Sequence, residues 1–208
     1  MKVLVTAGAT CEYLDPVRFL TNASSGRMGC AVAAAAAEAG HDVTLLHGRL
    51  AVPTPPGARA TPFVTVSDLQ RELDARFDAC DALVMAAAVG DFRPEKTLPT
   101  KIHRAAGPIT LRLYPTDDLL AGLRPRKRQG QVVVAFAVED GAPHQAEAKA
   151  RREMSAKGAD FVVVNTPEAM AAAASLACIL SPEAVVLPWA RRPKEQLAAE
   201  IVRLLDRP

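Results

Sequence analysis

The sequence predicts an α/β protein: a doubly wound, mostly parallel, Rossmann-like sheet with helices on both faces and a small antiparallel extension near the C-terminus. Apolar, β-prone runs alternate along the chain with helical segments, which is typical of strand–helix–strand units with right-handed crossovers. The run at 81–88 is apolar on both faces, as buried parallel strands are. Half of the residues are apolar, and no linker or internal repeat divides the chain. We therefore expect one domain over residues 1–208.

The N-terminal half shows this alternation most clearly. Strands are expected at 2–6, 42–48 and 81–88. The alanine-rich segment 30–39 predicts a helix that Gly40 ends, and Ser67-Asp68 is expected to cap a second helix that continues to residue 79. The segment 51–62 has four prolines, which exclude a helix or a central strand.

The C-terminal half begins with a break in the pattern. Residues 90–108 show no periodicity and predict a mobile flap. Further strands are expected at 110–114, 131–138 and 160–165, and further helices at 117–127, 143–157 and 192–206. Residues 170–189 predict two short strands joined at Ser181-Pro182, which form the antiparallel extension.

The segment 8–29 joins the first strand to the first helix and is unusually long. Such connections usually have two to six residues, whereas this one inserts nearly twenty polar and glycine-rich residues. In open parallel sheets, ligands bind at the carboxyl ends of the strands, where this segment begins. We therefore expect it to hold a ligand.

Charge and composition exclude several classes of function. A net charge of +2 predicts no nucleic-acid partner, and the basic run Arg124–Arg128 is interpreted as a solvated helix end. No apolar run approaches the roughly 18 residues of a membrane span, and Met1-Lys2-Val3 leads into a strand rather than a signal peptide. The four cysteines are scattered and share no metal-ligand spacing with a histidine. These features predict a cytoplasmic protein with reduced thiols, no membrane partner and no metal held by side chains.

Two common nucleotide motifs are absent. A dinucleotide site needs G-x-G-x-x-G directly between strand and helix, but Gly8, Gly26 and Gly29 are far too widely spaced. The second strand ends in His47-Gly48 rather than in the acidic residue that binds the ribose, and no Walker A motif exists. Ser24-Ser25-Gly26, before the first helix, is either an anion site at the helix N-terminus or a plain N-cap.

The chain resembles the phosphopantothenate–cysteine ligase (phosphopantothenoylcysteine synthetase) family, in a stand-alone form or as an isolated domain. The opening motif of that family is matched by VTAGAT at 5–10, DPVRFLTN at 15–22 and SSGRMG at 24–29. The resemblance continues at AAAVGDF (86–92), AFAVE (135–139) and KGAD (157–160), and covers residues 1–165.

This resemblance implies a coenzyme A biosynthesis ligase that joins 4′-phosphopantothenate to L-cysteine. The carboxylate would attack the α-phosphate of CTP with Mg²⁺ present, release pyrophosphate and form an acyl-cytidylate. The amino group of cysteine would then displace CMP. Family members are typically homodimers and are often fused to a flavin-dependent decarboxylase, which would here be a separate partner. The side chains leave the choice between CTP and ATP open.

The resemblance also implies site residues, each with an ordinary alternative. Asn22 would stabilise the oxyanion formed when cysteine attacks, or it is a turn former. Lys101 would close over the triphosphate, or it is a surface lysine. Asp91 would bind the ribose, or it caps a loop. Phe136 would line the base site, or it belongs to the core. The remaining nucleotide-binding candidates are Gly8, Ala87, Ala88 and Lys157, and the substrate-binding candidates are Arg18, which could instead pair with Asp15, and Ser24, Ser25 and Gly26 with Asn22.

Several positions depart from the family pattern. Ala9 replaces a glycine, Glu153 replaces a lysine expected near the phosphates, and Ala171–Ser175 stands where the family has F-x-S-D-x-N. These departures keep two alternatives open: a diverged, non-catalytic paralogue that binds a nucleotide, and a variant NAD(P)-dependent reductase. The missing acidic residue after the second strand counts against the reductase.

Overall fold

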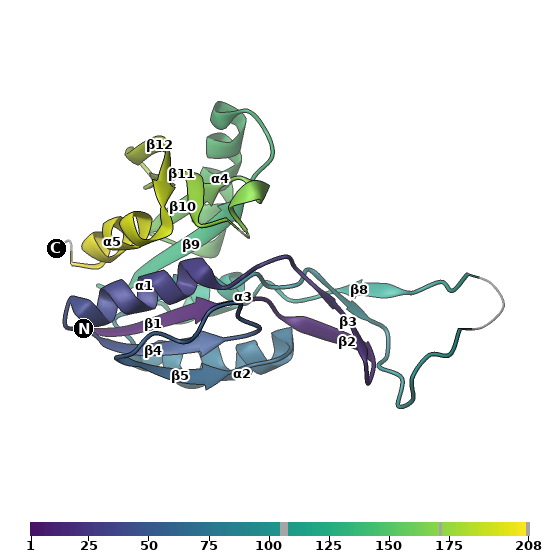
Figure 1. Cartoon of the computed structure of the whole chain (residues 1–208). Helices are drawn as coiled ribbons and strands as arrows, with labels where there is room; N and C mark the ends of the chain where they lie inside the picture. The colour runs from purple at the N-terminus through teal and green to yellow at the C-terminus, as the bar shows by residue number, and fades with distance from the viewer. Residues whose placement is uncertain (105–107, 171, 207–208) are drawn as a thin grey trace.

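The central element is an eight-stranded sheet, seen in Figure 1. The computed structural model describes residues 1–104, 108–170 and 172–206. In spatial order the strands are β12 (Val185–Pro193), β11 (Ala174–Leu180), β10 (Phe161–Asn165), β9 (Val132–Val138), β6 (Ala82–Met85), β1 (Lys2–Ala7), β4 (Asp42–His47) and β5 (Ala58–Pro62). The six strands from β10 to β5 are parallel, while β11 and β12 add an antiparallel edge. The predicted fold class and its antiparallel extension are confirmed.

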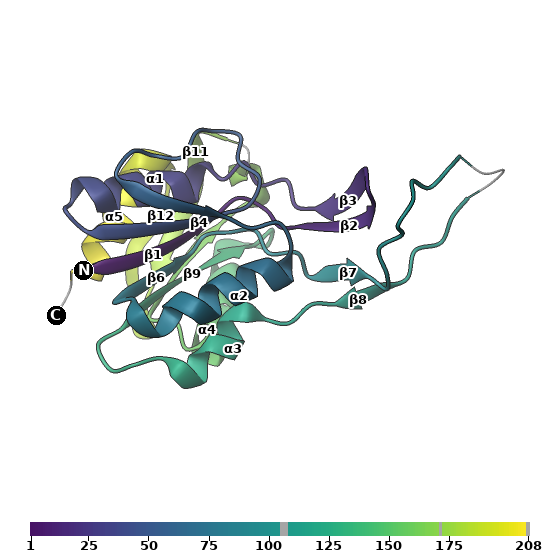
Figure 2. The ribbon, with the colours of Figure 1, turned by 90° about the horizontal axis from the view of Figure 1, so that it is seen from below.

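Helices cover both faces of the sheet. On one face lie α1 (Arg27–Glu38) and α5 (Lys194–Leu205); on the other lie α2 (Val66–Arg76), α3 (Leu119–Leu123) and α4 (Pro143–Lys157), which cross the near face in Figure 2. Along β1 the side chains alternate between the two resulting cores: Val3 and Val5 pack under α1 and α5, and Leu4 packs on the opposite face. This alternation explains why the central strand is apolar on both faces.

The order of the strands creates a topological switch point. From β1 the chain passes through α1 to β4 on one side, and later returns through α2 to β6 on the other side of β1. Ligands of doubly wound sheets bind in the crevice at the carboxyl ends of two such strands. The connections that leave this edge are residues 8–26 after β1 and residues 86–91 after β6. The long segment 8–29 and the motif AAAVGDF (86–92) therefore both begin at this edge.

The structure corrects two predicted loops. The segment 8–29 contains a hairpin of β2 (Cys11–Asp15) and β3 (Arg18–Thr21), so its polar residues are partly paired. The segment 51–62 ends in β5, which is tolerated despite Pro62 because β5 is an edge strand. The cap of α2 also differs, since Thr65 rather than Ser67-Asp68 is the N-cap and forms a capping box with Asp68.

The flap predicted at 90–108 contains one strand, β7 (Phe92–Pro94). This strand pairs antiparallel with β8 (Leu113–Pro115), which overlaps the strand predicted at 110–114, and the described parts of the chain between them project far from the sheet (Figures 1 and 2). We call residues 92–104 and 108–115 the arm. Residues 105–107 of the predicted flap, and Ala171 of the predicted extension, lie outside the described residues. The sequence missed the pairing because β7 has only three residues and no local periodicity.

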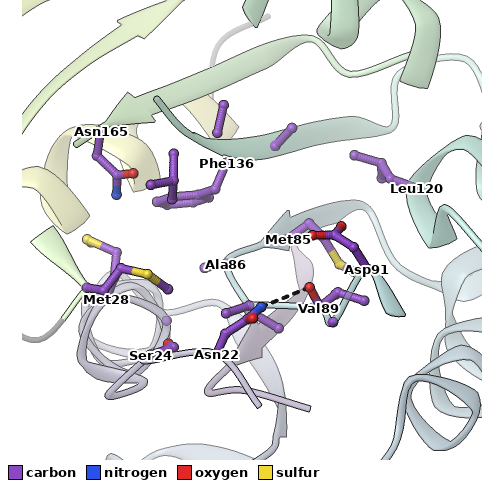
Figure 3. A pocket seen from close by; sticks show the side chains of 18 of the residues that line it. Asn22, Ser24, Met28, Met85, Ala86, Val89, Asp91, Leu120, Phe136 and Asn165 are labelled. Carbon is purple, nitrogen blue, oxygen red and sulfur yellow. Dashed lines mark hydrogen bonds between the residues drawn. The ribbon is translucent and has the colours of Figure 1, made fainter. Parts of the chain in front are cut away.

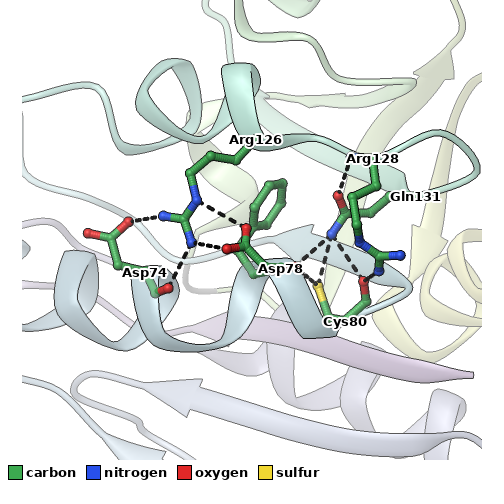
Figure 4. A network of polar contacts seen from close by, with 7 residues as sticks. Asp74, Asp78, Cys80, Arg126, Arg128 and Gln131 are labelled. Atoms are coloured by element: carbon green, nitrogen blue, oxygen red, sulfur yellow. Dashed lines mark hydrogen bonds and ion pairs between the residues drawn. The ribbon is translucent and has the colours of Figure 1, made fainter.

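The basic run Arg124–Arg128 forms ion pairs and hydrogen bonds with other parts of the chain. Arg126 binds Asp78 with its Nε and Nη2 atoms at 3.0 and 2.9 Å and Asp74 through Nη1 at 2.6 Å, which links α3 to the end of α2 (Figure 4). Lys127 bonds Asp160 at 2.6 Å, and Arg128 donates to the Cys80 carbonyl at 2.7 Å. The run therefore does more than end a helix, because its cations are partnered within the chain.

The cysteines and the helices bear on two expectations drawn from composition, namely reduced thiols and no membrane span. All four cysteines are free and buried, and burial raises the pKa of Cys178 to about 12. Within the described ranges, no helix has the length and apolarity needed to span a bilayer.

Candidate functional site

A cavity of about 790 Å³ opens at the carboxyl edge of the sheet, at the switch point between β1 and β6. Its floor is formed by residues 85–91 after β6 and residues 135–139 at the end of β9, and one wall is the segment 22–29 that leads into α1. The opposite wall consists of the start of α3 and one face of α4. Figure 3 shows side chains from these elements pointing into the same space. A volume of this size accommodates a nucleotide or a cofactor.

Hydrogen bonds fasten the two connections at this edge to each other. The Ala88 N–H donates to the Gly8 carbonyl at 2.8 Å, and the Gly90 N–H donates to Thr10 Oγ1 at 2.9 Å. Asn22 Nδ2 donates to the Val89 carbonyl at 3.0 Å, the contact drawn in Figure 3. Since an amide group has two N–H donors, Asn22 is held in place by one and keeps the other.

The start of α1 borders the cavity and lacks a side-chain cap. Its N-cap is Gly26, which has a φ of 74° and provides no side-chain cap, so the motif caps the helix through its backbone, and its role as an anion site stays a prediction. Ser25 Oγ donates to the Met170 carbonyl at 2.9 Å, and Ser24 Oγ accepts from the Gly26 N–H at 3.3 Å. The free N–H groups of the first turn, together with the helix dipole, favour a negatively charged ligand.

The floor has small side chains at Ala87 and Ala88. The backbone N–H groups of both residues are engaged within the chain, that of Ala87 with Thr6 Oγ1 at 2.9 Å and that of Ala88 with the Gly8 carbonyl at 2.8 Å. Asp91 is exposed at the rim, and Phe136 lies half-buried at the end of β9 (Figure 3). Phe136 also packs against the core under α1 and α5, so a cavity-lining position and a core position are both present.

Three predicted site residues lie outside the cavity lining. Gly8 packs against Gly26 of the lining, since a Cβ built on Gly26 would be 3.3 Å from the Gly8 Cα. Arg18 binds the Asp15 carboxylate through Nη1 at 2.8 Å, as its alternative interpretation expected. Lys101 is exposed on the arm, next to Ile102, whose N–H bonds Asp15 at 3.0 Å. Their roles in binding or catalysis stay predictions.

The remaining predicted site residues are brought together. They come from four separate parts of the chain and line one cavity: Asn22, Ser24, Ser25, Gly26, Ala87, Ala88, Asp91, Phe136 and Lys157. Lys157 Nζ lies 3.3 Å from the Asp118 carboxylate and 3.8 Å from Glu153, the position where the charge departs from the family pattern.

Several further residues of the cavity were not predicted as site residues. Lys149 lies on α4 with Glu153 and Lys157, and its Nζ is 3.0 Å from the Glu139 carboxylate. Asn165 ends β10 at the carboxyl edge, and its buried Oδ1 has no hydrogen-bond partner among the described residues (Figure 3). Lys194 is buried and donates to the Ala169 carbonyl at 2.8 Å, and burial lowers its pKa. The four-residue spacing of 149, 153 and 157 is the one signal that could have revealed a shared face.

The described residues provide no side-chain cage for a metal ion, since no three His, Cys, Asp or Glu groups are suitably clustered. Its lining combines four cationic side chains (Arg27, Lys149, Lys157 and Lys194), five carboxylates (Asp91, Asp117, Asp118, Glu139 and Glu153) and the amides of Asn22 and Asn165. Cationic and amide groups of this kind can bind a phosphorylated ligand and stabilise a negative charge that develops during acyl transfer.

Comparisons with known proteins agree with this geometry. Residues 1–207 match the DNA/pantothenate metabolism flavoprotein C-terminal domain family. The chain is 42% identical over 172 residues to the coenzyme A biosynthesis bifunctional protein CoaBC of Mycobacterium bovis, a match that covers 79% of this chain and 41% of the relative. The Bacillus subtilis CoaBC is 38% identical over 168 residues, covering 80% and 40%. The chain thus spans about two fifths of the length of these relatives.

Solved structures show the same fold. The C-terminal domain of a CoaBC protein superposes with a TM-score of 0.78 at 28% identity, covering 98% of this chain and 93% of that one. A DNA/pantothenate metabolism flavoprotein from Streptococcus pneumoniae gives a TM-score of 0.86 at 23% identity, covering 99% and 98%. The resemblance found in the sequence motifs is confirmed: the chain belongs to the DNA/pantothenate metabolism flavoprotein C-terminal domain family, which includes the synthetase domain of CoaBC.

Proposed function

We propose that this protein joins 4′-phosphopantothenate to L-cysteine, with CTP as co-substrate and an acyl-cytidylate as intermediate. One observation carries the proposal: the segments 22–29 and 86–91 meet in one cavity at the switch point of the sheet, next to an uncapped helix N-terminus. The CoaBC relatives support the pathway, and a Cab2 variant with the same fold has been solved with phosphopantothenate-cysteine.

In the first step a carboxylate oxygen of the substrate attacks the α-phosphorus of CTP, and the bond to the β,γ-pyrophosphate breaks. Pyrophosphate leaves with its charge, so positive groups must face it. We assign this task to Mg²⁺ that arrives with the nucleotide and to cavity cations, including Lys157. Mg²⁺ normally keeps several waters and binds mainly through the phosphates, which suits a cavity whose described residues form no cluster of metal ligands.

In the second step the amino group of cysteine attacks the acyl carbonyl, CMP leaves and the nitrogen loses a proton. The carbonyl oxygen becomes an oxyanion during the attack. Asn22 is suited to donate to it, because its position is held by Val89 while one N–H stays available. The start of α1, with Ser24, Ser25 and Gly26, would bind an anionic part of the substrates.

Recognition of the nucleotide would rest on the floor of the cavity. The small side chains of Ala87 and Ala88 would leave room for the base, Phe136 would pack against the base, and Asp91 would accept from the ribose hydroxyls. The preference for CTP over ATP is part of the proposal and follows from the family resemblance.

The arm supports the proposal of a homodimer. Apolar side chains along it are exposed without a cover, for example Phe92 at 53% and Ile109 at 59%. Exposed apolar surface of this kind marks an interaction site. The bifunctional CoaBC relatives further suggest that the product passes to a flavin-dependent decarboxylase.

Pyrophosphate release tests the function. Purified protein is incubated with 4′-phosphopantothenate, Mg²⁺ and either CTP or ATP, with and without cysteine. We expect release that requires the pantothenate substrate, is faster with CTP, and yields the amide when cysteine is present. Nucleotide binding without any release would instead support the non-catalytic paralogue, an alternative favoured by Glu153, whose carboxylate faces the cavity beside Lys157. Binding of NADPH, followed by fluorescence, would support the reductase.

A further inference from the structure

The cationic groups of the cavity fall into two sets. Arg27 and Lys194 lie at the starts of α1 and α5, and Lys194 is already engaged with a backbone carbonyl. Lys149 and Lys157 lie on α4, across the cavity, with Glu153 midway between them in the sequence. The spacing of four residues places all three α4 side chains on one face of the helix.

The three α4 side chains form a chain of ion pairs together with carboxylates of neighbouring elements. Lys149 Nζ lies 3.0 Å from Glu139, which follows β9, and 3.9 Å from Glu153. Lys157 Nζ lies 3.8 Å from Glu153 and 3.3 Å from Asp118, the N-cap of α3. Glu153 therefore shares its charge between two lysines that both face the cavity.

We propose that Lys149 is a phosphate-binding residue of the nucleotide site, and that Glu153 lowers nucleotide affinity by pairing with Lys149 and Lys157 in the empty cavity. The inference rests on the proposed function for the identity of the ligand, a nucleoside triphosphate. Phosphate oxygens would replace Glu153 as partners of both lysines. The side chain of Lys149 is 52% exposed, so its ammonium can leave Glu153 without crossing packed core.

The groups around Lys149 make it a stable cation. Glu139 is the nearest, and its hydrogen bond and charge raise the pKa of Lys149, with smaller contributions from Glu153 and Asp140. The Glu139 side chain is only 9% exposed, so Lys149 also compensates a buried charge. A structural role as the partner of Glu139 is therefore the alternative that the experiment must separate from phosphate binding.

The test measures the equilibrium binding of CTP with Mg²⁺ by titration calorimetry, without the other substrates. Lys149→Gln should weaken CTP binding roughly tenfold, the usual effect of removing one charge-assisted contact. Glu153→Gln should strengthen it a few-fold. Arg152→Gln is the matched control, because Arg152 is exposed on α4 and is not part of the cavity lining, so this variant should bind CTP like the wild type.

Two further variants separate binding from structure. In Lys149→Gln/Glu153→Lys the cation moves one helical turn along the cavity wall while Glu139 stays unpaired, and CTP affinity should return to within about threefold of the wild type. Lys149→Gln should also lower the melting temperature, because it leaves the buried Glu139 carboxylate unpaired. In Glu139→Gln/Lys149→Gln that carboxylate is neutralised, so the melting temperature should return toward the wild-type value while CTP binding stays weak. Wild-type affinity in this second double variant, or equal losses in Lys149→Gln and Arg152→Gln, would overturn the proposal.

The outcome for wild-type protein separates this inference from the proposed function. A wild-type chain that binds CTP but releases no pyrophosphate refutes the ligase and leaves the role of Lys149 testable by binding alone. A wild-type chain that binds CTP and makes the amide, with Lys149→Gln unchanged in both, refutes only the role of Lys149.

Discussion

The carboxylate of Asp15 accepts a hydrogen bond from the backbone N–H of Ile102 at 3.0 Å, although 87 residues separate the two in the sequence. The same carboxylate accepts from the backbone N–H groups of Val17 and Arg18 and from the Arg18 guanidinium. Arg18 in turn donates to the Ile102 carbonyl at 2.8 Å. One buried carboxylate thus fastens the arm to the β2–β3 hairpin.

The titration of Asp15 should report this contact. Burial alone would raise its pKa, but the hydrogen bonds from Ile102, Val17 and Arg18 and the charge of Arg18 outweigh burial and lower the pKa to about 2. A lowered pKa means that the stabilisation is present above the ordinary value of 3.8 and is lost as the pH falls toward 2. We expect the amide resonance of Ile102 to stay constant from pH 7 to pH 4 in NMR spectra. A midpoint near 3.8 would contradict the contact.

Asn22→Ala should separate the two chemical steps. The substitution removes the proposed oxyanion donor, which typically raises the barrier by roughly 3–4 kcal/mol. Because no oxyanion at the acyl carbonyl forms in the first step, pyrophosphate release from CTP should continue in the same variant. Stopped assays that quantify pyrophosphate and amide in one sample provide the internal control. Amide formation at the wild-type rate would refute the role of Asn22.

Gly29→Ala should destabilise the fold through backbone contact. A Cβ at Gly29 would lie 2.5 Å from the Ala7 Cβ and 2.6 Å from the Thr6 carbonyl oxygen, where α1 crosses β1. Overpacking of this kind costs about 1–3 kcal/mol in the free energy of unfolding. Gly122→Ala in α3 is the matched control, because a Cβ there meets nothing within 4 Å and adds helix propensity. Urea unfolding of both variants tests the difference, and equal stabilities would refute the contact.

Lys101 is expected to act in the cavity of a second copy. The bond between Ile102 and Asp15 holds the neighbouring Lys101 beside its own β2–β3 hairpin, whose strands do not line the cavity. Asn22→Ala and Lys101→Ala should each be inactive in amide formation, while their mixture should regain about a quarter of the wild-type activity, because half of the dimers would be mixed and have one intact site. Failure of the mixture to exceed either variant would refute action between subunits.

Elements defined by residues close together in the sequence could be predicted, whereas elements defined by pairing with another segment could not. The helix predicted at 143–157 coincides with α4, because its Pro143 and Gly158 boundaries act within a few residues. The β2–β3 hairpin was missed, since its short polar strands are defined mainly by pairing with each other. The pairing of β7 with β8 was missed for a similar reason: it joins segments about twenty residues apart.

The candidate site also combines residues that could be predicted from the sequence with residues that could not. The motifs at 22–26 and 86–91 could be selected from the sequence because each follows a predicted strand and has a family pattern. Lys149 could not be selected, since its importance depends on Glu139 at the end of a neighbouring strand.

The sequence by itself determined the main alternation of strands and helices, the carboxyl edge of the sheet as the place where a ligand should bind, and the family. Hydrophobic periodicity, caps and motifs depend on near neighbours, so they can be read along the chain. Only the tertiary structure decided that Lys101 lies on an arm outside the cavity, that Asp15 bonds Ile102 of that arm, and that Lys149 pairs with Glu139. Those relationships join residues from different elements, and their distances are set by how the layers pack.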